Sequence, residues 1–246
     1  MVKELQRCFT PLTLKRQNST LYRKFTKQTN LDAQSLAPST GHTANISKFV
    51  DYHLQDHVKH LASYIKDTTD FINKTKDLQV LEDSVLVTID VSALYTNIPD
   101  NEEIQAVKNT LSKAFTPIFL LTVITTFLTL ILTLNNCIVN GIHYLQTKGC
   151  ANCTSTYANI FMGEFEEKHI YPRIKDKSSK YLRYVDDIFM IWTGTQAQIE
   201  DFTKQINKVH PSIKFTTESS NTQVNFQHNS PNQPLKTHHK NIQKTN

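Results

Sequence analysis

The pair Asp186 and Asp187 stands between two mostly apolar stretches, 182–185 and 188–192, and this arrangement limits the fold more than any other feature of the chain. Both stretches are rich in β-branched and aromatic residues, which favour strands. The sequence therefore predicts a hairpin that carries the two carboxylates at its tip. Adjacent like charges repel, and a divalent cation lowers that cost. A solvated Asp-Asp turn without a ligand is the alternative interpretation.

A second apolar run, Ser84 to Ile89, leads directly into Asp90. Two strands that each end in Asp bring three carboxylates together when they pair in one sheet. Carboxylate oxygens are ligands that Mg²⁺ prefers, and two such ions ~3.5–4 Å apart suit an in-line phosphoryl displacement. We therefore predict that Asp90, Asp186 and Asp187 are metal ligands and catalytic residues.

The phrases around these residues resemble reverse transcriptases. The Tyr-Val-Asp-Asp hairpin resembles their motif C, and Asp90 with Tyr95 resembles motif A. The phrases 88–99 and 157–163 are most similar to Penelope-like retroelements, and the resemblance extends over roughly 41–226. It implies an α+β fold, the palm of a right-hand polymerase, whose antiparallel sheet carries the catalytic Asp residues and packs on helices, with the fingers mostly missing.

The resemblance also implies an activity, RNA-directed DNA synthesis, with an RNA template, a DNA primer and deoxynucleoside triphosphates as partners. Asp90 and Asp186 would hold two Mg²⁺ ions, or Mn²⁺ in their place, with Asp187 in a lesser role. Tyr95 would exclude a 2′-hydroxyl by its bulk, although a core aromatic is the alternative. Tyr184 and Arg183 would flank the primer end.

Three further substrate contacts follow from the same resemblance. Gln146 and Gly149 fall in the phrase that resembles motif B, where a Gly-rich turn lets the backbone approach the substrate. Lys214 would protonate the leaving pyrophosphate, with an ordinary surface lysine as the alternative. The motif B phrase is shorter here than in the family, and Gln34 stands where the family has the Arg that contacts the triphosphate. Both departures predict weak activity and favour an alternative, a retroelement remnant that binds nucleic acid without catalysis.

The chain divides by composition into a basic arm or remnant of the fingers (1–40), the palm-like part (41–226) and a polar tail or thumb stub (227–246). A net charge of +5 favours an anionic partner but does not distinguish nucleic acid from an acidic protein. No secretory signal precedes the four cysteines, which predicts a reducing compartment, nuclear or cytoplasmic. Cys150-Ala-Asn-Cys153 leaves a zinc site open, with reduced thiols favoured.

Hydrophobic spacing predicts helices over 43–66, 69–76, 155–168 and 196–209, and another after Pro99. A hairpin is expected from 213–218 and 222–226. The stretch Pro117 to Leu134 is long and apolar enough for a membrane span, but five Thr residues lower its hydropathy. We favour a helix buried on most sides and expect no membrane partner; a small membrane-anchored protein is the third alternative.

Overall fold

The computed structural model describes residues 9–11, 44–78, 80–81, 83–133, 136–139, 142–146, 155–222, 224 and 226. The chain forms two compact units, one of Met1–Gln55 with Tyr95–Ala158 and the other of Asp56–Leu94 with Asn159–Asn246. Most of the basic arm with Gln34, the Cys150–Cys153 motif, Gly149 and the polar tail lie outside the described residues.

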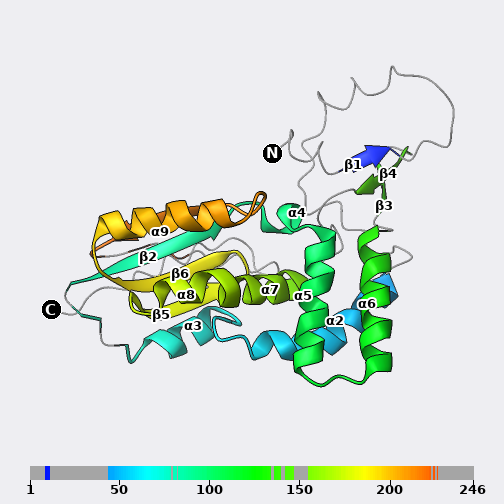
Figure 1. The fold of residues 1–246 in the computed structure, drawn as a ribbon, viewed down its shortest axis with the longest axis horizontal. Coiled ribbons are helices and arrows are strands. Elements are labelled where there is room, and N and C mark those ends of the chain that lie inside the picture. The colour runs from blue at the N-terminus through cyan, green and yellow to red at the C-terminus, as the bar shows by residue number, and fades with distance from the viewer. Residues whose placement is uncertain are drawn as a thin grey trace, which may run out of the picture. The chain divides into compact units, whose positions relative to one another are not determined.

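The second unit is built on a four-stranded antiparallel sheet in the order β5-β6-β2-β7 (Figure 1). Its strands are β2 (Ser84–Val91), β5 (Ser178–Tyr184), β6 (Asp187–Thr193) and β7 (Phe215–Ser220). The two predicted apolar strands, β2 and β6, are direct neighbours. The predicted hairpin around Asp186 is confirmed, with β5 and β6 as its arms.

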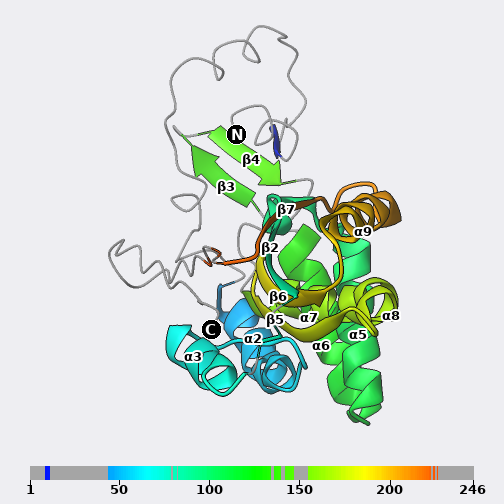
Figure 2. The same ribbon diagram turned by 90° about the vertical axis from the view of Figure 1, so that its left-hand side faces the viewer.

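Both faces of this sheet are covered, which explains why the centre of β6 is apolar without alternation. On one face, Phe189 meets Phe71 of α3 (Thr68–Thr75), with ring centroids 5.3 Å apart. On the other face, Trp192 lies 5.6 Å from Phe202 of α9 (Gln196–Val209). Figure 2 shows the strands in the order β7, β2, β6 and β5, with α9 to their right. Residues 188–192 are all buried, so every side chain in this stretch contributes to a core.

The predicted hairpin of 213–218 with 222–226 is wrong. Strand β7 pairs with β2, from Phe215 opposite Val91 to Ser220 opposite Leu86. None of the described residues of the second segment, Thr222, Val224 and Phe226, lies in a strand, and Val224 and Phe226 are buried in the cluster around Phe71 and Phe189. The edge of β2 offered a full ladder of hydrogen bonds, and burial of two apolar side chains favoured packing over a local hairpin.

Helix starts agree with the predictions to within one residue, and two helix ends differ by more than that. Helix α2 (Ala44–Lys59) ends before the predicted Lys66 because the next segment bonds to β5. The amide of Arg183 donates to the carbonyl of Ser63 over 2.6 Å, and the amide of Ile65 donates to the carbonyl of Arg183 over 2.9 Å. Helix α7 (Ser155–Phe165) continues past Lys168, through a π-helical turn, η3 (Glu166–Ile170), into α8 (Tyr171–Ile174).

The first unit holds α4 (Leu94–Asn97), α5 (Asp100–Lys113), α6 (Ile118–Thr133) and a three-stranded sheet in the order β1-β4-β3. Its strands are β1 (Phe9–Pro11), β3 (Asn136–Val139) and β4 (Ile142–Gln146). The acidic first turn of α5 follows the prediction, but Glu103 in it is buried. Burial and the neighbouring Asp100 raise the pKa of Glu103 to about 8.

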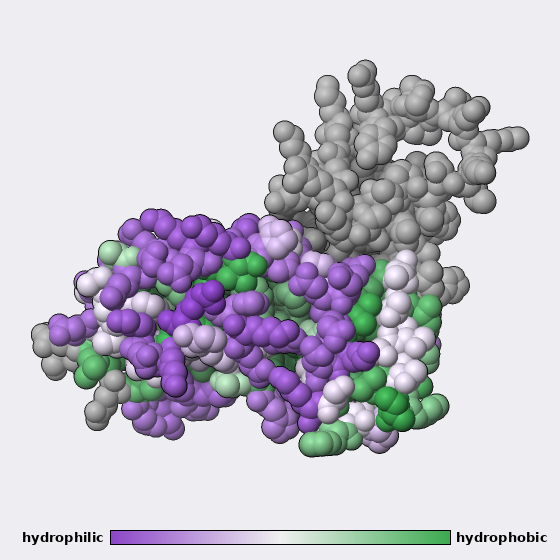
Figure 3. All heavy atoms as spheres, in the orientation of Figure 1, coloured by the Kyte–Doolittle hydropathy of each residue, from purple (hydrophilic) through white to green (hydrophobic). Residues whose placement is uncertain are grey.

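Helix α6 corresponds to the long apolar stretch, and only one stripe of it is buried, contrary to the expected burial on most sides. The buried residues are Leu121, Ile124, Leu128, Ile131 and Leu132. Ile118 and Phe119 are each 78% exposed, and pale and green spheres mark this helix in Figure 3. Four Thr hydroxyls donate to carbonyls one turn back, as Thr129 does to Thr125 over 2.8 Å, which satisfies these four within the helix. None of the helices described here has the length and hydropathy that crossing a bilayer requires.

Candidate active site

The structure brings Asp90, Asp186 and Asp187 to one end of the central strands of the sheet. Asp90 and Asp187 are cross-strand partners in the β2–β6 ladder. Because directly opposed residues project from the same face of a sheet, the two carboxyl groups emerge side by side. Asp186 occupies the turn that leads into β6, and its carbonyl accepts a hydrogen bond from the Val91 amide over 3.0 Å. The predicted convergence from neighbouring strands is therefore present.

The turn itself is strained. Tyr184 pairs with Asp187, so Val185 and Asp186 form a two-residue hairpin loop. Val185 has a φ of 53°, in the left-handed region. A β-branched residue rarely adopts this conformation, which costs about 1–3 kcal/mol and is common at functional sites. Tight hairpin turns with a positive φ at the first position ordinarily hold Gly there.

The environment of this tip disfavours the charged form of the Asp186 and Asp187 carboxyl groups. The pKa of Asp187 is raised to about 7 by burial, then by the charges of Asp186 and Asp90. Burial and the charge of Asp90 also raise the pKa of Asp186, while a backbone hydrogen bond and the charge of Arg183 oppose that shift. Two carboxyl groups with raised pKa values at one strand end form a site that a cation would stabilise.

The donor set fits Mg²⁺, although the side chains do not form a complete cage. Within the described ranges, no group of three His, Cys, Asp or Glu side chains is arranged to hold a metal ion. Mg²⁺ does not require such a group, since it usually keeps several waters and binds through one or two carboxylates plus substrate phosphates. Asp90 and Asp186 supply hard oxygen donors of the right kind, with Asp187 beside them.

A buried network lies under the turn, and the sequence analysis did not identify it. Arg183, expected at the primer end, is instead fully buried. Its Nε donates to Oε1 of Glu166 over 2.6 Å, and its Nη1 donates to the carbonyl oxygen of Val185 over 3.0 Å. Ser63 and Tyr181 also donate to the Glu166 carboxylate, over 2.6 and 3.0 Å. An Arg in an apolar strand next to Asp-Asp was the one available signal.

Two other predicted substrate contacts lie in the same unit. Tyr184 ends β5 on the face of the Phe71 cluster and is half-buried. Burial, Tyr64, Asp186, Asp67 and Asp187, in that order, raise its pKa. Lys214 precedes β7, and its carbonyl accepts from the Ser92 amide over 2.8 Å, which places it beside the end of β2. Its Nζ donates to the carbonyls of Asn207 and His210, over 2.7 and 2.9 Å, at the end of α9.

The remaining predicted contacts belong to the first unit. Tyr95 lies in α4, five residues after Asp90, and is half-buried. Gln146 is the last residue of β4 and pairs with Phe9 of β1. Gly149 follows it outside the described residues.

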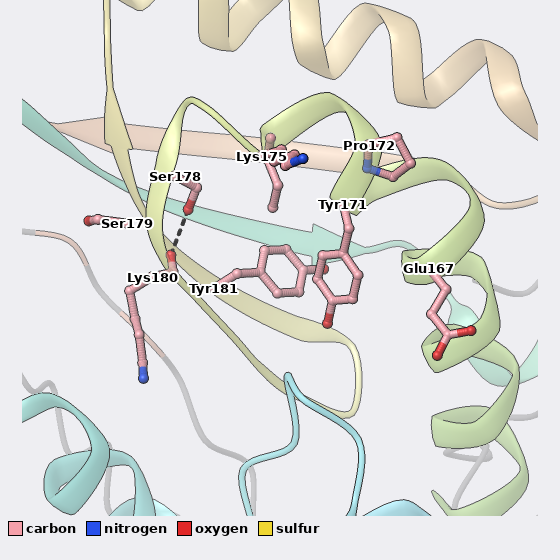
Figure 4. A pocket seen from close by; sticks show the side chains of 9 residues that line it. Glu167, Tyr171, Pro172, Lys175, Ser178, Ser179, Lys180 and Tyr181 are labelled. Carbon is pink, nitrogen blue, oxygen red and sulfur yellow. Dashed lines mark hydrogen bonds between the residues drawn. The ribbon is translucent and has the colours of Figure 1, made fainter.

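A surface hollow of about 460 Å³ lies at the opposite end of β5 from the carboxylates (Figure 4). The rings of Tyr171 and Tyr181 meet there edge to face, with centroids 5.5 Å apart. The hydroxyl of Ser178 donates to the carbonyl of Lys180 over 2.8 Å, a local hydrogen bond at the start of β5. None of the predicted site residues lines this hollow, so the carboxylate tip remains the candidate site.

A four-stranded antiparallel sheet packed on helices, with Asp residues at the ends of its two central strands, has a polymerase palm-like fold. Solved polymerases share it. The chain is similar to an apo telomerase from Candida tropicalis truncated from its C-terminal domain, with a TM-score of 0.54 and 13% identity, over 73% of this chain and 42% of that one. It is similar to a BmCPV RNA-dependent RNA polymerase at the elongation state, with a TM-score of 0.54 and 14% identity, over 74% of this chain and 19% of that one.

A Candida albicans telomerase in complex with a fragment of telomeric RNA gives a TM-score of 0.53 at 10% identity, over 79% of this chain and 36% of that one. The chain thus spans less than half the length of each of these polymerases. No family model and no curated protein matches the sequence. At these identities the likeness concerns the fold, and the phrases around Asp90 and Asp186 carry the remaining argument.

Proposed function

We propose that the chain is the palm of an RNA-directed DNA polymerase, a nucleotidyltransferase of a Penelope-like retrotransposon. The observation that carries the proposal is the register of β2 with β6, which sets Asp90 opposite Asp187 and puts Asp186 in the adjoining turn. The fold is similar both to telomerases and to viral RNA polymerases. The Tyr-Val-Asp-Asp turn and Tyr95 are the features that favour DNA synthesis.

In this proposal Asp90 and Asp186 hold two Mg²⁺ ions, with Asp187 beside them. When bound, the ions lower the pKa of the primer 3′-hydroxyl and neutralise the triphosphate and the departing pyrophosphate. Asp90 and Asp186 fix the positions of those charges, because both sit on hydrogen-bonded backbone. The raised pKa of Asp187 means that its carboxyl group holds a proton more readily than an ordinary Asp. Lys214 would have to leave the helix carbonyls before it could protonate pyrophosphate.

The first test is primer extension on an RNA template with deoxynucleotides and Mg²⁺. Extension is expected to be slow, because Gln34 replaces the triphosphate-binding Arg and the motif B phrase is short. Asp186→Asn should lower it at least ~10³-fold, since one ligand to both ions is lost. Asp176→Asn is the matched control, because Asp176 is exposed in the loop before β5.

Extension that survives Asp186→Asn would overturn the assignment. A wild-type chain that binds nucleic acid with a strong dependence on salt, yet adds no nucleotide, would favour the non-catalytic remnant instead.

The second test addresses the choice between DNA and RNA synthesis. If Tyr95 lies under the sugar, Tyr95→Ala should let ribonucleotides in and reduce the preference for deoxynucleotides by about 10-fold or more. The measurement is the ratio of the two incorporation rates on one template. Tyr52→Ala serves as a control, since Tyr52 is 76% exposed on α2. An unchanged ratio for Tyr95→Ala would assign this residue to the core.

A further inference from the structure

The buried side chain of Arg183 connects Glu166, in the π-helical turn η3, to the turn that carries Asp186. The side chains of Arg183 and Glu166 are 0% and 1% exposed, and their ion pair spans 2.6 Å. The same guanidinium donates from Nη1 to the carbonyl oxygen of Val185. That oxygen belongs to the peptide unit between Val185 and Asp186, so the contact acts directly on the backbone of the turn.

The turn requires such support because its conformation is unfavourable for the residue present. Val185 has a φ of 53°, which a β-branched side chain resists, and an unsupported hairpin would relax toward an ordinary φ. Relaxation would rotate the peptide unit that precedes Asp186 and move its side chain. Strain of this kind persists only where the surrounding structure holds it.

The partners of Arg183 are themselves fixed. Glu166 accepts further bonds from Ser63 and Tyr181, and Asn159 contributes a carbonyl oxygen 3.2 Å from Nη2 of Arg183. Glu166 is the first residue of the π-helical turn η3 and follows Asn159 by seven residues, so the two lie on one face of the helix, and both are buried. The planar fork of Arg183 can serve Glu166, Asn159 and Val185 at once, which a lysine ammonium cannot reproduce.

We propose that Arg183 is a positioning residue: through Glu166 on one side and the Val185 carbonyl on the other, it holds the strained Val185–Asp186 turn and thereby fixes the Asp186 carboxylate beside Asp90. The proposal rests on the proposed function only in that Asp186 serves there as a metal ligand. The mechanical part, that Arg183 holds the turn, stands on the hydrogen bonds alone.

The test is hydrogen exchange of the backbone amides in the turn, measured by mass spectrometry on the full chain without metal. The variant is Arg183→Met combined with Glu166→Gln, which removes both charges and leaves no unpaired ion in the core. Exchange in the peptide that spans 184–188 should become about tenfold faster or more, while β7 stays as in the wild type. Arg173→Met is the matched control, since Arg173 is exposed and donates a hydrogen bond to the His169 carbonyl.

An unchanged exchange rate in 184–188, with Arg183 and Glu166 both replaced, would overturn the proposal. If the double variant does not fold, Arg183→Lys takes its place, because it keeps the buried charge and loses the fork. Faster exchange in the turn supports the proposal for that variant as well, and wild-type exchange overturns it.

Binding of Mn²⁺ by the same proteins separates this proposal from the proposed function. If the wild type binds Mn²⁺ and the double variant binds it at least about tenfold more weakly, Arg183 positions a metal ligand. If the wild type binds no Mn²⁺ and extends no primer, the proposed function fails. The exchange measurement still decides whether Arg183 holds the turn.

Discussion

The carboxylate tip of the β5–β6 hairpin and the buried Arg183–Glu166 cluster next to it differ in whether their charges are paired. In the cluster, Arg183 and Glu166 are out of solvent and paired with each other, with Ser63, Tyr181 and Asn159 as further partners. At the tip, only three residues away in sequence, burial is the main cause that raises the pKa values of Asp186 and Asp187, and the neighbouring carboxylates, including Asp90, add to it. The Arg183–Glu166 cluster balances its charges whereas the tip does not, so the tip is where an added cation would be stabilised.

Breaking the balanced cluster should have the largest effect. Arg183→Met leaves the Glu166 carboxylate buried without its cation and should cost about 3–5 kcal/mol in the free energy of unfolding. Urea unfolding measures this value. Adding Glu166→Gln should restore most of the loss, because the uncompensated charge is then gone. A loss under about 1 kcal/mol for Arg183→Met alone would show that water reaches the cluster.

Removing the Asp187 charge at the tip should instead stabilise the metal-free folded chain. The folded-state pKa of Asp187 is about 7, whereas an Asp in an unfolded chain titrates near ~3.9. Between these values the folded state binds more protons, so this residue's contribution to stability falls as the pH rises from about 4 to 7. Asp187→Asn should therefore raise the Tm of the metal-free chain at pH 7.5 by on the order of 2–4 °C, and leave it nearly unchanged below pH 4.

Two further measurements sharpen this prediction. Asp176→Asn, the exposed control, should leave the Tm unchanged at both pH values. Mg²⁺ should raise the Tm of the wild type more than that of Asp187→Asn, because a ligand that binds only the folded state stabilises it. An equal gain from Asp187→Asn at pH 4 and at pH 7.5 would contradict the assignment of the effect to charge.

Removing the strain in the turn should have the smallest effect on stability. Val185→Gly relieves the left-handed φ at the cost of a more flexible unfolded chain, for a net gain of about 0.5–1 kcal/mol in urea unfolding. Ala93→Gly is the matched control, since Ala93 also has a positive φ, 48°. The two should gain similarly, but only Val185→Gly should weaken Mn²⁺ binding. Loss of stability in Val185→Gly would mean that the Val185 side chain contributes more than its strain removes.

The strands that carry the candidate site could be predicted because their pattern is local. Each of the two apolar runs leads into or out of an Asp, and neighbouring strands that meet at those residues place the carboxylates together. The pairing of β7 could not be read in this way. Segments 213–218 and 222–226 are adjacent and alternate, so the sequence favoured a hairpin, whereas the edge of β2 lies more than a hundred residues earlier.

The role of Arg183 was beyond the reach of sequence patterns for a related reason. Its position in β5, next to the turn, is compatible with a side chain in solvent at the primer end. Glu166 precedes it by seventeen residues, and no periodic pattern in the sequence links one helix position to one residue of a later strand.

The amino-acid sequence by itself determined which residues could form the carboxylate tip, because apolar runs beside Asp specify strands and their ends. Tertiary structure alone decided which charges are paired, which are buried and which remain for a ligand. Hydrogen bonds between segments distant in the chain decide these outcomes, and their energies depend on burial and geometry that no local pattern contains.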